Sequence, residues 1–498
     1  MNEQRPARVS LLPVSRRIAA LLLAASMLLP LVACGQSTEA DTTAAAATTA
    51  GAADTLPETE FFPAVERKDY DGETFRMISI NEEGTWVYGS EEEYNSSNKQ
   101  VMNDVLYEMN TLVEDYLGIS IEYEYVEHIS GQSVIFDKVN PTVMSGDDVY
   151  QLCILPAYRN VASFVTQNSA MDLYELDNLD FSQSYWNREV IESLQIGDHA
   201  YLGLGDICYH KVYPVYCNKD LLAQAGRAMP YDKVRNGTWT IDEFLTISTD
   251  LYQDNGDGQV NNQDVFGFST LWNINANCLM QASDIYVVTR FDDGGFELSM
   301  YGDRLVTLYE KLYSWSKQDD VHIWGYSQRE DETITTNFLD NRVYFTIDYL
   351  DAQYLDAEFA VGILPIPKYD VAQENYSHVN WGDNICVPKT VQNREMVGEA
   401  LELMSYYSET MVMTRFYDDV LQLRVSDAPD DREMVEMVFD TIVFDPGIAY
   451  CDGNDQLFNL VYLLEYCVLN NQESIASYYN RNQKTAAHFL SKNIYKTK

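Results

Sequence analysis

The sequence has few basic residues for its length. Among 498 residues there are 33 Lys and Arg against 77 Asp and Glu, which gives a formal net charge of −44. A surface of this sign repels a phosphate backbone, so we expect no nucleic-acid partner. The same chain is 46% hydrophobic and 12% aromatic. This apolar content excludes a disordered acidic chain and predicts a large folded body with two domains or two lobes.

Histidine and cysteine are also scarce. The six His and eight Cys contain no Cys-x-x-Cys pair and no cluster with the spacing of a zinc site. Seven Cys follow Cys34 at irregular spacing, and we expect buried thiols rather than a disulfide framework.

Catalytic signatures are missing as well. The chain has no Gly-x-Ser-x-Gly elbow, no Gly-x-x-x-x-Gly-Lys-Ser/Thr loop and no His-Glu-x-x-His. Runs of acids such as 91–93 are typical of solvated faces, because 77 carboxylates make adjacent pairs inevitable. We therefore predict a protein that is not an enzyme. A secreted glycosidase and a surface adhesin remain as alternatives.

The N-terminus carries an export signal. Arg16 and Arg17 precede an apolar run from Ile18 to Val32, which is shorter than the roughly twenty residues of a membrane span. The run ends in Leu31-Val32-Ala33-Cys34, which resembles a bacterial lipobox. We predict a signal peptide over residues 1–33 and a lipid on Cys34, so that the protein sits on the extracellular face of the membrane. An ordinary signal peptide with an incidental Cys is the alternative.

The next segment is too poor in large apolar residues to form a core. Residues 34–66 are rich in Ala and Thr and are predicted to be a flexible tether. Beyond it, a strand over 74–80, an amphipathic helix over 101–117 and a strand over 119–125 predict a parallel α/β unit. From Glu395 onward the pattern is mostly helical.

Four further segments carry a family resemblance. They are Tyr216-Cys217-Asn218-Lys219-Asp220-Leu221, Thr238-Trp239-Thr240-Ile241-Asp242-Glu243-Phe244, Phe338-Leu339-Asp340-Asn341-Arg342-Val343, and Leu364-Pro365-Ile366-Pro367. In this order the chain resembles bacterial extracellular solute-binding proteins of family 1, the sugar-binding type that serves ABC importers. The lipobox and the tether are similar to those of the family in Gram-positive bacteria.

This resemblance implies an α/β, periplasmic-binding-protein-like fold with two lobes, crossing hinge segments and a helical C-terminal part. Lobe 1 is expected over 67–206 and 344–385, and lobe 2 over 207–343 and 386–498. Hinge segments are expected near 201–209, 341–349 and 382–388. The implied function is capture of a carbohydrate, an oligosaccharide by preference, by a monomer that delivers it to permease subunits.

A sugar site needs aromatic faces for C–H groups and planar polar groups for hydroxyls. An aromatic residue recurs beside a polar one at several loops where the resemblance places the cleft. Core packing is the alternative for each aromatic taken alone. The predicted ligand-binding residues are Tyr158, Arg159, Tyr209, Trp272, Asn273, Asp348, Tyr349, Trp381 and Asp383.

The loop over 253–264 resembles an EF-hand or dockerin calcium loop. With Gly258 at position six, the oxygen ligands would come from Asn255, Asp257, Asn261 and Asp264. Gln at position one and Asp at position twelve depart from that pattern and weaken it. Calcium is therefore a hypothesis, a solvated turn is the alternative, and no other cofactor is expected.

Overall fold

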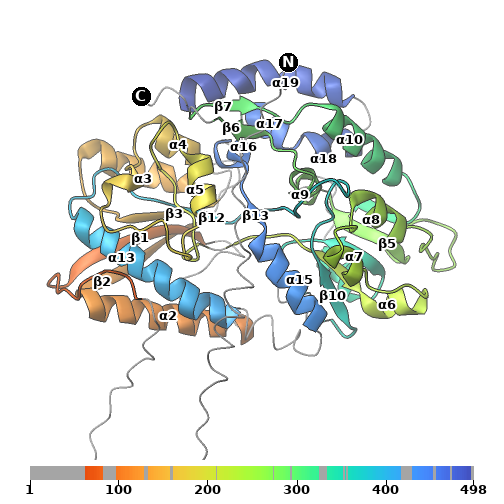
Figure 1. Ribbon diagram of the computed structural model, residues 1–498, viewed down its shortest axis with the longest axis horizontal. Coiled ribbons are helices and arrows are strands. Elements are labelled where there is room, and N and C mark those ends of the chain that lie inside the picture. Colours follow the sequence, from red (N-terminus) through yellow and green to blue (C-terminus); the bar gives the residue numbers. More distant parts are fainter. Residues whose placement is uncertain are drawn as a thin grey trace, which may run out of the picture. The chain divides into compact units, whose positions relative to one another are not determined.

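Figure 1 shows the computed structural model of the chain. It describes residues 62–81, 97–127, 133–156, 161–208, 210–272, 274–291, 294–324, 334–350, 354, 357–416, 429–451, 456–470 and 474–494. The chain divides into two units, 1–62 and 63–498, and the second unit contains the fold. The predicted signal peptide, Cys34 and nearly all of the tether lie outside the described residues.

The first lobe is built on a four-stranded sheet with the order β12-β3-β1-β2. Its strands are β1 (Glu73–Asn81), β2 (Ile119–Glu127), β3 (Leu152–Pro156) and β12 (Asp383–Cys386). The first three pair in parallel, and β12 runs antiparallel to β3. The parallel unit predicted from the sequence is confirmed by the register of β1 with β2, in which Glu73 pairs with Ile119.

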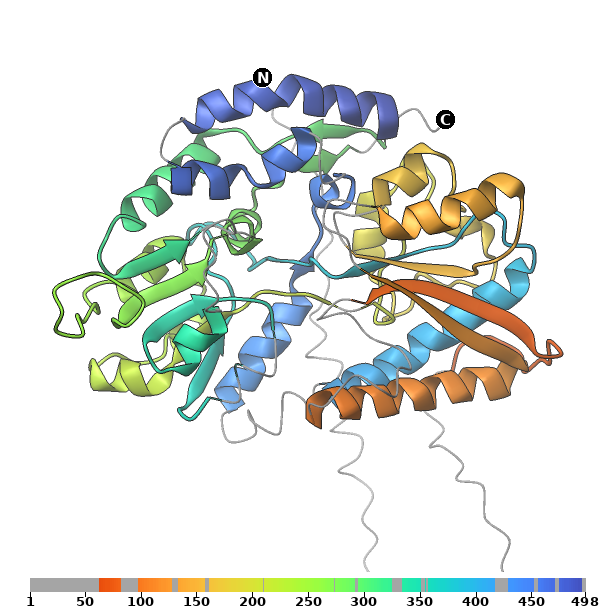
Figure 2. The same ribbon diagram turned by 180° about the vertical axis from the view of Figure 1, so that it is seen from behind.

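Helices cover both faces of this sheet. On one face, α2 (Ser97–Leu117) and α13 (Arg394–Tyr407) lie side by side (Figures 1 and 2). On the other face lie α3 (Val134–Ser145) and α4 (Val161–Thr166), followed in the chain by the 3-10 turn Leu173–Glu175 and α5 (Arg188–Leu194).

The sequence explains where α2 lies and where it stops. Val105, Met109 and Val113 recur every four residues and are buried, so this stripe faces the sheet. The helix ends before Gly118, which has a φ of 61°. A Cβ at this position would lie 2.3 Å from an Asp69 carboxylate oxygen, so glycine is required for conformation and for space.

The second lobe is built on a five-stranded sheet with the order β10-β4-β9-β5-β8. Its strands are β4 (Val215–Asn218), β5 (Phe266–Leu271), β8 (Val321–Trp324), β9 (Val343–Ile347) and β10 (Val361–Leu364). β5, β8 and β9 are parallel, whereas β4 runs antiparallel to both β9 and β10. Its helices are α6 (Lys219–Gln224), α7 (Tyr231–Arg235), α8 (Ile241–Ile247), α9 (Ile274–Ala282), α10 (Asp303–Trp315), α11 (Ile334–Leu339) and α15 (Pro429–Asp440).

Aromatic side chains fill both faces of the five-stranded sheet. On one face, the ring of Phe244 lies 5.5 Å from Phe268 and 5.6 Å from Trp315. On the other face, Tyr216 stacks on Tyr354 with ring centres 4.3 Å apart. Because both faces are covered, strands such as β4 and β9 are buried along their whole length.

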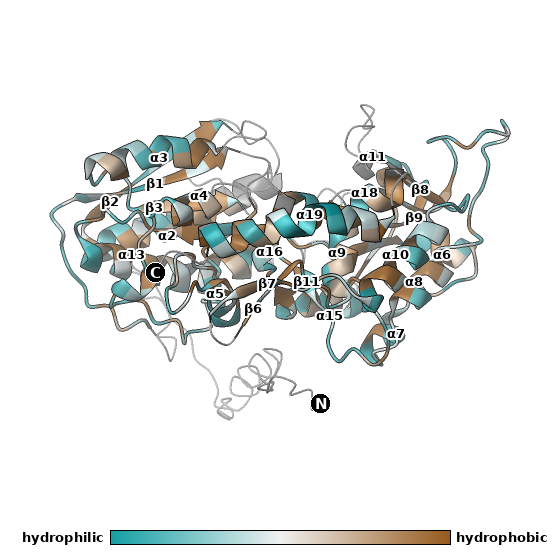
Figure 3. Ribbon diagram, turned by 90° about the horizontal axis from the view of Figure 1, so that it is seen from above, coloured by the Kyte–Doolittle hydropathy of each residue, from teal (hydrophilic) through white to brown (hydrophobic). Residues whose placement is uncertain are grey.

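The C-terminal segment is helical, as predicted, and it contacts elements from both halves of the chain. It comprises α16 (Pro446–Ala449), α17 (Gln456–Val461), α18 (Leu463–Asn470), α19 (Ile475–Phe489) and the π-helical turn Leu490–Ile494. α16 contacts α5, and α18 contacts α9 and α10. Figure 3 shows hydrophilic residues along much of α19, in keeping with its widely spaced buried positions. Among the described helices, none combines the length and apolar character that a membrane crossing requires.

The predicted lobe boundaries at 344 and 386 are wrong. Residues 344–385 were expected to return to lobe 1, but β9 and β10 are strands of the five-stranded sheet of lobe 2. The chain crosses after β10, over 365–382, and β12 then joins β3. Residues beyond 386 do not all belong to lobe 2, since α13 packs against α2. An apolar strand looks the same in sequence whichever sheet it joins, so its pattern did not show where the crossing falls.

Candidate functional site

The carboxyl edge of the four-stranded sheet brings two predicted site residues together. β12 runs antiparallel to β3, so that Asp383 at its start pairs with Pro156 at the end of β3. Trp381 lies two residues before Asp383, and both are buried, with 3% and 2% of their surface exposed. Tyr158 and Arg159 follow β3 directly but lie outside the described residues.

The carboxyl edge of the five-stranded sheet holds a second group. β9 ends at Ile347, and Asp348 and Tyr349 follow it. Because β4 is antiparallel to β9, the residues that precede β4 lie beside this same end. Tyr213 is in edge contact with Tyr349 at 6.3 Å, and Lys211 Nζ lies 4.8 Å from the centre of the Tyr349 ring.

Asp348 is held in place by hydrogen bonds within this lobe. The Tyr349 backbone N–H donates to Asp348 Oδ1 at 2.8 Å, and the Tyr354 hydroxyl donates to Oδ2 at 2.5 Å. Burial, with Asp348 nearby, raises the pKa of the Cys278 thiol well above its ordinary value.

Trp272 follows β5 and is fully buried, so its ring faces protein atoms in this structure. The neighbouring polar groups also serve the core. Asn275 Nδ2 donates to Thr270 Oγ1 at 2.7 Å and to the Ile347 carbonyl at 2.6 Å. Asn273 and Tyr209 lie outside the described residues.

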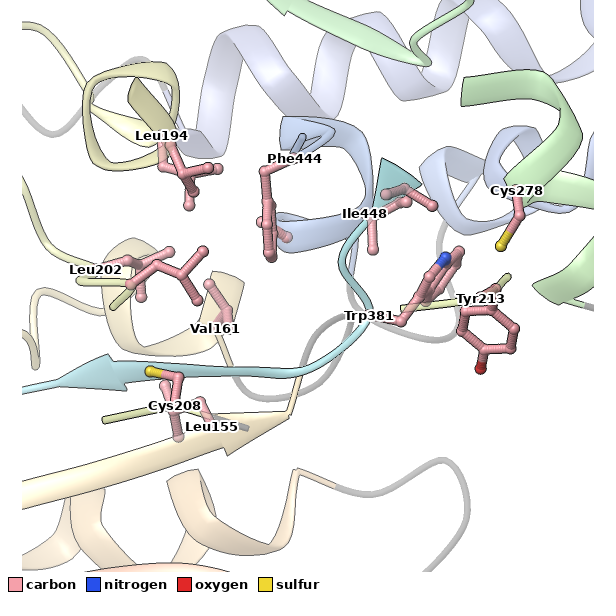
Figure 4. Packing of buried hydrophobic residues seen from close by; sticks show 14 of the residues in the cluster. Leu155, Val161, Leu194, Leu202, Cys208, Tyr213, Cys278, Trp381, Phe444 and Ile448 are labelled. Atoms are coloured by element: carbon pink, nitrogen blue, oxygen red, sulfur yellow. The ribbon is translucent and has the colours of Figure 1, made fainter. Parts of the chain in front are cut away.

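A row of aromatic rings extends from Trp381 into the C-terminal helices. Tyr462 lies 6.2 Å from Trp381, and Phe458 on α17 lies 4.6 Å from Tyr462. Phe458 and Tyr462 are only partly buried. Figure 4 shows the indole of Trp381 beside Tyr213 and Cys278. A sugar ring can stack on an aromatic face of this kind when polar groups lie nearby to bind its hydroxyls.

Phe458 and Tyr462 were not among the residues predicted from the sequence. A signal for them was present, because Phe458, Tyr462 and Tyr466 recur every four residues and therefore share one side of the helical stretch. Lys211 and Tyr213 were also missed, since the strand pattern around them gave no reason to expect a site.

The two lobes are connected by strands that run beside one another. The Trp381 N–H donates to the Lys211 carbonyl at 3.0 Å, and the Asn380 N–H donates to the Val443 carbonyl at 3.0 Å. β11 (His378–Val379) pairs in parallel with β13 (Ile442–Val443). We call residues 210–212, 378–382 and 441–443 the crossing ribbon.

The crossing ribbon agrees only partly with the expected hinge segments. Segment 210–212 follows directly after 201–209, and 378–382 ends where the expected segment 382–388 begins. The expected segment 341–349 is wrong, because it contains β9 at the centre of the five-stranded sheet.

His378 has an uncharged ring, and its hydrogen bonds hold the edge of the crossing ribbon in place. Its Nε2 accepts a hydrogen bond from the Ile366 N–H at 2.9 Å, and Nδ1 lies 2.7 Å from Thr441 Oγ1. Burial lowers the pKa of His378 to about 3, so the ring stays uncharged at neutral pH and can keep accepting at Nε2.

The calcium-like loop is closed by its own hydrogen bonds. Asp264 is 1% exposed, and its carboxylate accepts from the N–H groups of Asn255 and Asn261, both at 3.0 Å. Asn261 Nδ2 donates to Asp257 Oδ2 at 3.0 Å. The described residues include no group of three or more His, Cys, Asp or Glu arranged to hold a metal ion.

No family model matches the chain, and no curated protein matches it either. Several solved structures, however, are similar to this chain. An ABC substrate-binding protein from Listeria monocytogenes in complex with cycloalternan is 16% identical, with a TM-score of 0.56 over 85% of this chain and 99% of that one. The sugar-binding protein MalE from Xanthomonas citri is 13% identical, with a TM-score of 0.59 over 84% and 98%.

The GacH receptor of Streptomyces glaucescens, solved unliganded and with acarbose, is 14% identical, with a TM-score of 0.55 over 84% and 99%. This likeness shows the fold. The chain has the periplasmic-binding-protein-like architecture of ABC substrate-binding proteins, with two α/β lobes and crossing segments, as the sequence resemblance predicts.

Proposed function

We propose that this chain is an extracellular solute-binding protein that captures a carbohydrate between its two lobes and delivers it to an ABC importer. An oligosaccharide is the preferred ligand, since the solved neighbours include complexes with cycloalternan, maltotriose and maltotetraose. The protein acts as a monomer, docks on permease subunits and leaves its ligand chemically unchanged. Its only membrane attachment is the lipid on Cys34 at the surface of a Gram-positive cell.

One observation carries this proposal. The support is that aromatic and carboxylate side chains lie beside the carboxyl ends of β3 and β9, one strand of each lobe, close to the crossing ribbon. Trp381 and Asp383 come from one lobe edge, and Asp348 and Tyr349 come from the other. In open α/β sheets, ligands bind at this edge of the strands.

A thermal-shift screen tests the proposal. The purified protein is heated with maltose, maltotriose, maltotetraose, cycloalternan, acarbose, mannotriose and tagatose in separate samples. Ligand at about 100 times its Kd stabilises a protein by about 2.7 kcal/mol, so binding raises Tm by a few degrees. The absence of a shift with every member of an extended carbohydrate panel would contradict the proposal. A sharp rise in Tm with one sugar separates a solute-binding protein from an adhesin. Mass spectrometry of the recovered sugar separates it from a glycosidase, which would cleave the sugar.

We propose in addition that the loop over 253–264 takes Ca²⁺ once its side chains rearrange. The support is the oxygen spacing of Asn255, Asp257, Asn261 and Asp264. Calorimetric titration with Ca²⁺ is expected to show heat for the wild type and none for Asp264→Asn. Mg²⁺ is the control, since it prefers a smaller octahedral site. No heat and no thermal shift with the wild type would leave the loop as a solvated turn.

A further inference from the structure

Asn380 lies at the centre of the crossing ribbon and is fully buried. Its side-chain oxygen Oδ1 accepts two backbone hydrogen bonds, from the Lys211 N–H at 2.9 Å and from the Gly382 N–H at 2.8 Å. These two donors fix the orientation of the amide, because its nitrogen could not accept from them. Asn380 Nδ2 is thereby directed at His210 Nδ1, which lies 3.2 Å away.

This geometry fixes the protonation state of His210. An amide nitrogen only donates, so Nδ1 of His210 must be the acceptor, and the ring proton must be on Nε2. Nε2 lies 3.5 Å from Asp206 Oδ1, where that proton has an acceptor. The ring is 9% exposed and meets Phe439 of α15 edge-on at 6.4 Å.

The charged groups around His210 come from three places. Asp206 precedes it in the same segment, Lys211 follows it directly, and Asp440 follows Phe439 on α15. Burial raises the pKa of Asp440 above its ordinary value. The carboxylate that lies beside Nε2 is that of Asp206. Asp206 favours a charged ring, whereas the Nδ2 group of Asn380 opposes a proton on Nδ1.

We propose that His210 and Asn380 form an acid-sensitive latch in the crossing ribbon, which protonation of His210 opens. A proton on Nδ1 places two donors face to face. Rotation of the Asn380 amide relieves that conflict only by giving up the hydrogen bonds to the N–H groups of Lys211 and Gly382. Either response weakens the attachment of segment 210–212 to segment 378–382. Histidine is the side chain that changes charge in the mildly acidic range.

The latch would control how easily the two lobes move relative to each other, and this role rests on the proposed function. Its chemistry does not depend on any ligand. The test therefore uses the ligand-free protein and measures amide hydrogen exchange in peptides that contain Lys211 and Gly382, at about pH 8 and about pH 5.5. Rates are corrected for the intrinsic pH dependence of exchange. His210→Asn keeps an acceptor in place of Nδ1 and cannot be protonated there, and His199→Asn is the matched control.

His199 is a suitable control because it is half exposed and pairs with Asp172 at 2.7 Å, away from the ribbon. We expect the wild type and the His199→Asn variant to lose protection at the lower pH by about fivefold, the effect of one lost hydrogen bond. The His210→Asn variant is expected to keep the same protection at both pH values. Equal protection of the wild type at the two pH values would overturn the latch, as would an equal loss in His210→Asn.

A second measurement keeps the test decisive if His210→Asn does not fold. The protein has six His, so selective ¹³Cε1 labelling gives six NMR signals, and His210→Gln assigns the one of interest. A His210 signal that stays in the neutral form down to about pH 5.5 would overturn the latch. Sugar binding is measured separately at pH 8. If no sugar binds, the proposed function is contradicted, but the result of the latch experiment is unaffected.

Discussion

Glu465 on α18 is an acid whose charge opposes folding. Burial raises its pKa to about 7, well above the ordinary value near 4.5. The folded state thus binds the proton more tightly than the unfolded state. The resulting stabilisation is complete below about pH 4.5 and is lost as the pH rises through about 7.

Replacing Glu465 by Gln removes this dependence. We expect Glu465→Gln to gain on the order of 2 kcal/mol in the free energy of unfolding, relative to the wild type, between pH 5 and pH 8. Urea unfolding at the two pH values measures the change. Glu310→Gln on α10 is the control, because that side chain is exposed and the helix contacts α18. A constant difference between variant and wild type at both pH values would contradict the prediction.

Tyr462 is the side chain on which ligand stacking is most easily tested. It is partly buried beside Trp381, so truncating it removes aromatic surface without emptying the core. Tyr462→Ala is expected to weaken the affinity for the sugar found in the screen by about 1 kcal/mol or more, measured by calorimetry.

Tyr466 provides the comparison for this experiment. It is 37% exposed, and its tilted ring lies 4.5 Å from that of Tyr478 on α19. Tyr466→Ala should leave affinity unchanged. Equal affinities of the wild type and Tyr462→Ala would remove the aromatic row from the site.

At the scale of elements, α13 anchors the start of the folded chain. Glu399 on this helix is 3% exposed in its side chain and accepts from Lys68 Nζ at 2.5 Å and from the Tyr70 hydroxyl at 2.8 Å. Asn178 Nδ2 donates to it at 2.9 Å. These bonds tie the segment before β1 to a helix from the far half of the sequence.

Removing the cation from this anchor leaves the buried Glu399 carboxylate with two neutral donors and no compensating charge. We expect Lys68→Met to lower the free energy of unfolding by about 3 kcal/mol. The double variant Lys68→Met, Glu399→Gln should recover part of that loss, because the amide carries no charge. Denaturant titration of both variants gives the comparison. A double variant no more stable than Lys68→Met would show that the charge of Glu399 is not the cause.

Local elements and the two-lobed fold could be predicted from the sequence, but the assignment of β9, β10 and α13 to their lobes could not. The helix over 101–117 and the strands on either side of it were found because Val105, Met109 and Val113 recur at helical spacing before Gly118. The placement of β12 depends on pairing with β3, more than two hundred residues earlier. No local pattern records such a partner, and the boundaries at 344 and 386 failed for that reason.

The residues of the candidate site remain a prediction, and the sequence indicates only some of those that the structure brings together. Asp348, Tyr349, Trp381 and Asp383 follow or precede strands, and strand ends are visible in the sequence. Phe458 comes to the site from a helix near the C-terminus, by a tertiary contact that spacing alone does not specify. Trp272 is an aromatic residue at a strand end, as expected of a ligand-binding residue, but it is fully buried. An aromatic residue in this position can equally well pack in the core.

At the scale of the whole molecule, the proposal requires the lobes to move when ligand binds. The saturating sugar from the thermal screen is expected to lower the radius of gyration measured by small-angle scattering, because closure brings the lobes together. A non-binding sugar at the same concentration is the control. Unchanged scattering under saturation would exclude closure while leaving simple binding intact.

Strand β12 has a consequence for how this chain can be divided. The first lobe takes its fourth strand and the helix α13 from residues 383–407, after the chain has already built most of the second lobe. A fragment that stops near residue 210 would expose the free side of β3 and the surface that α13 covers. The first lobe can therefore not be produced as an autonomous domain by simple truncation, and a nascent polypeptide cannot complete it until residues 383–407 have been synthesised.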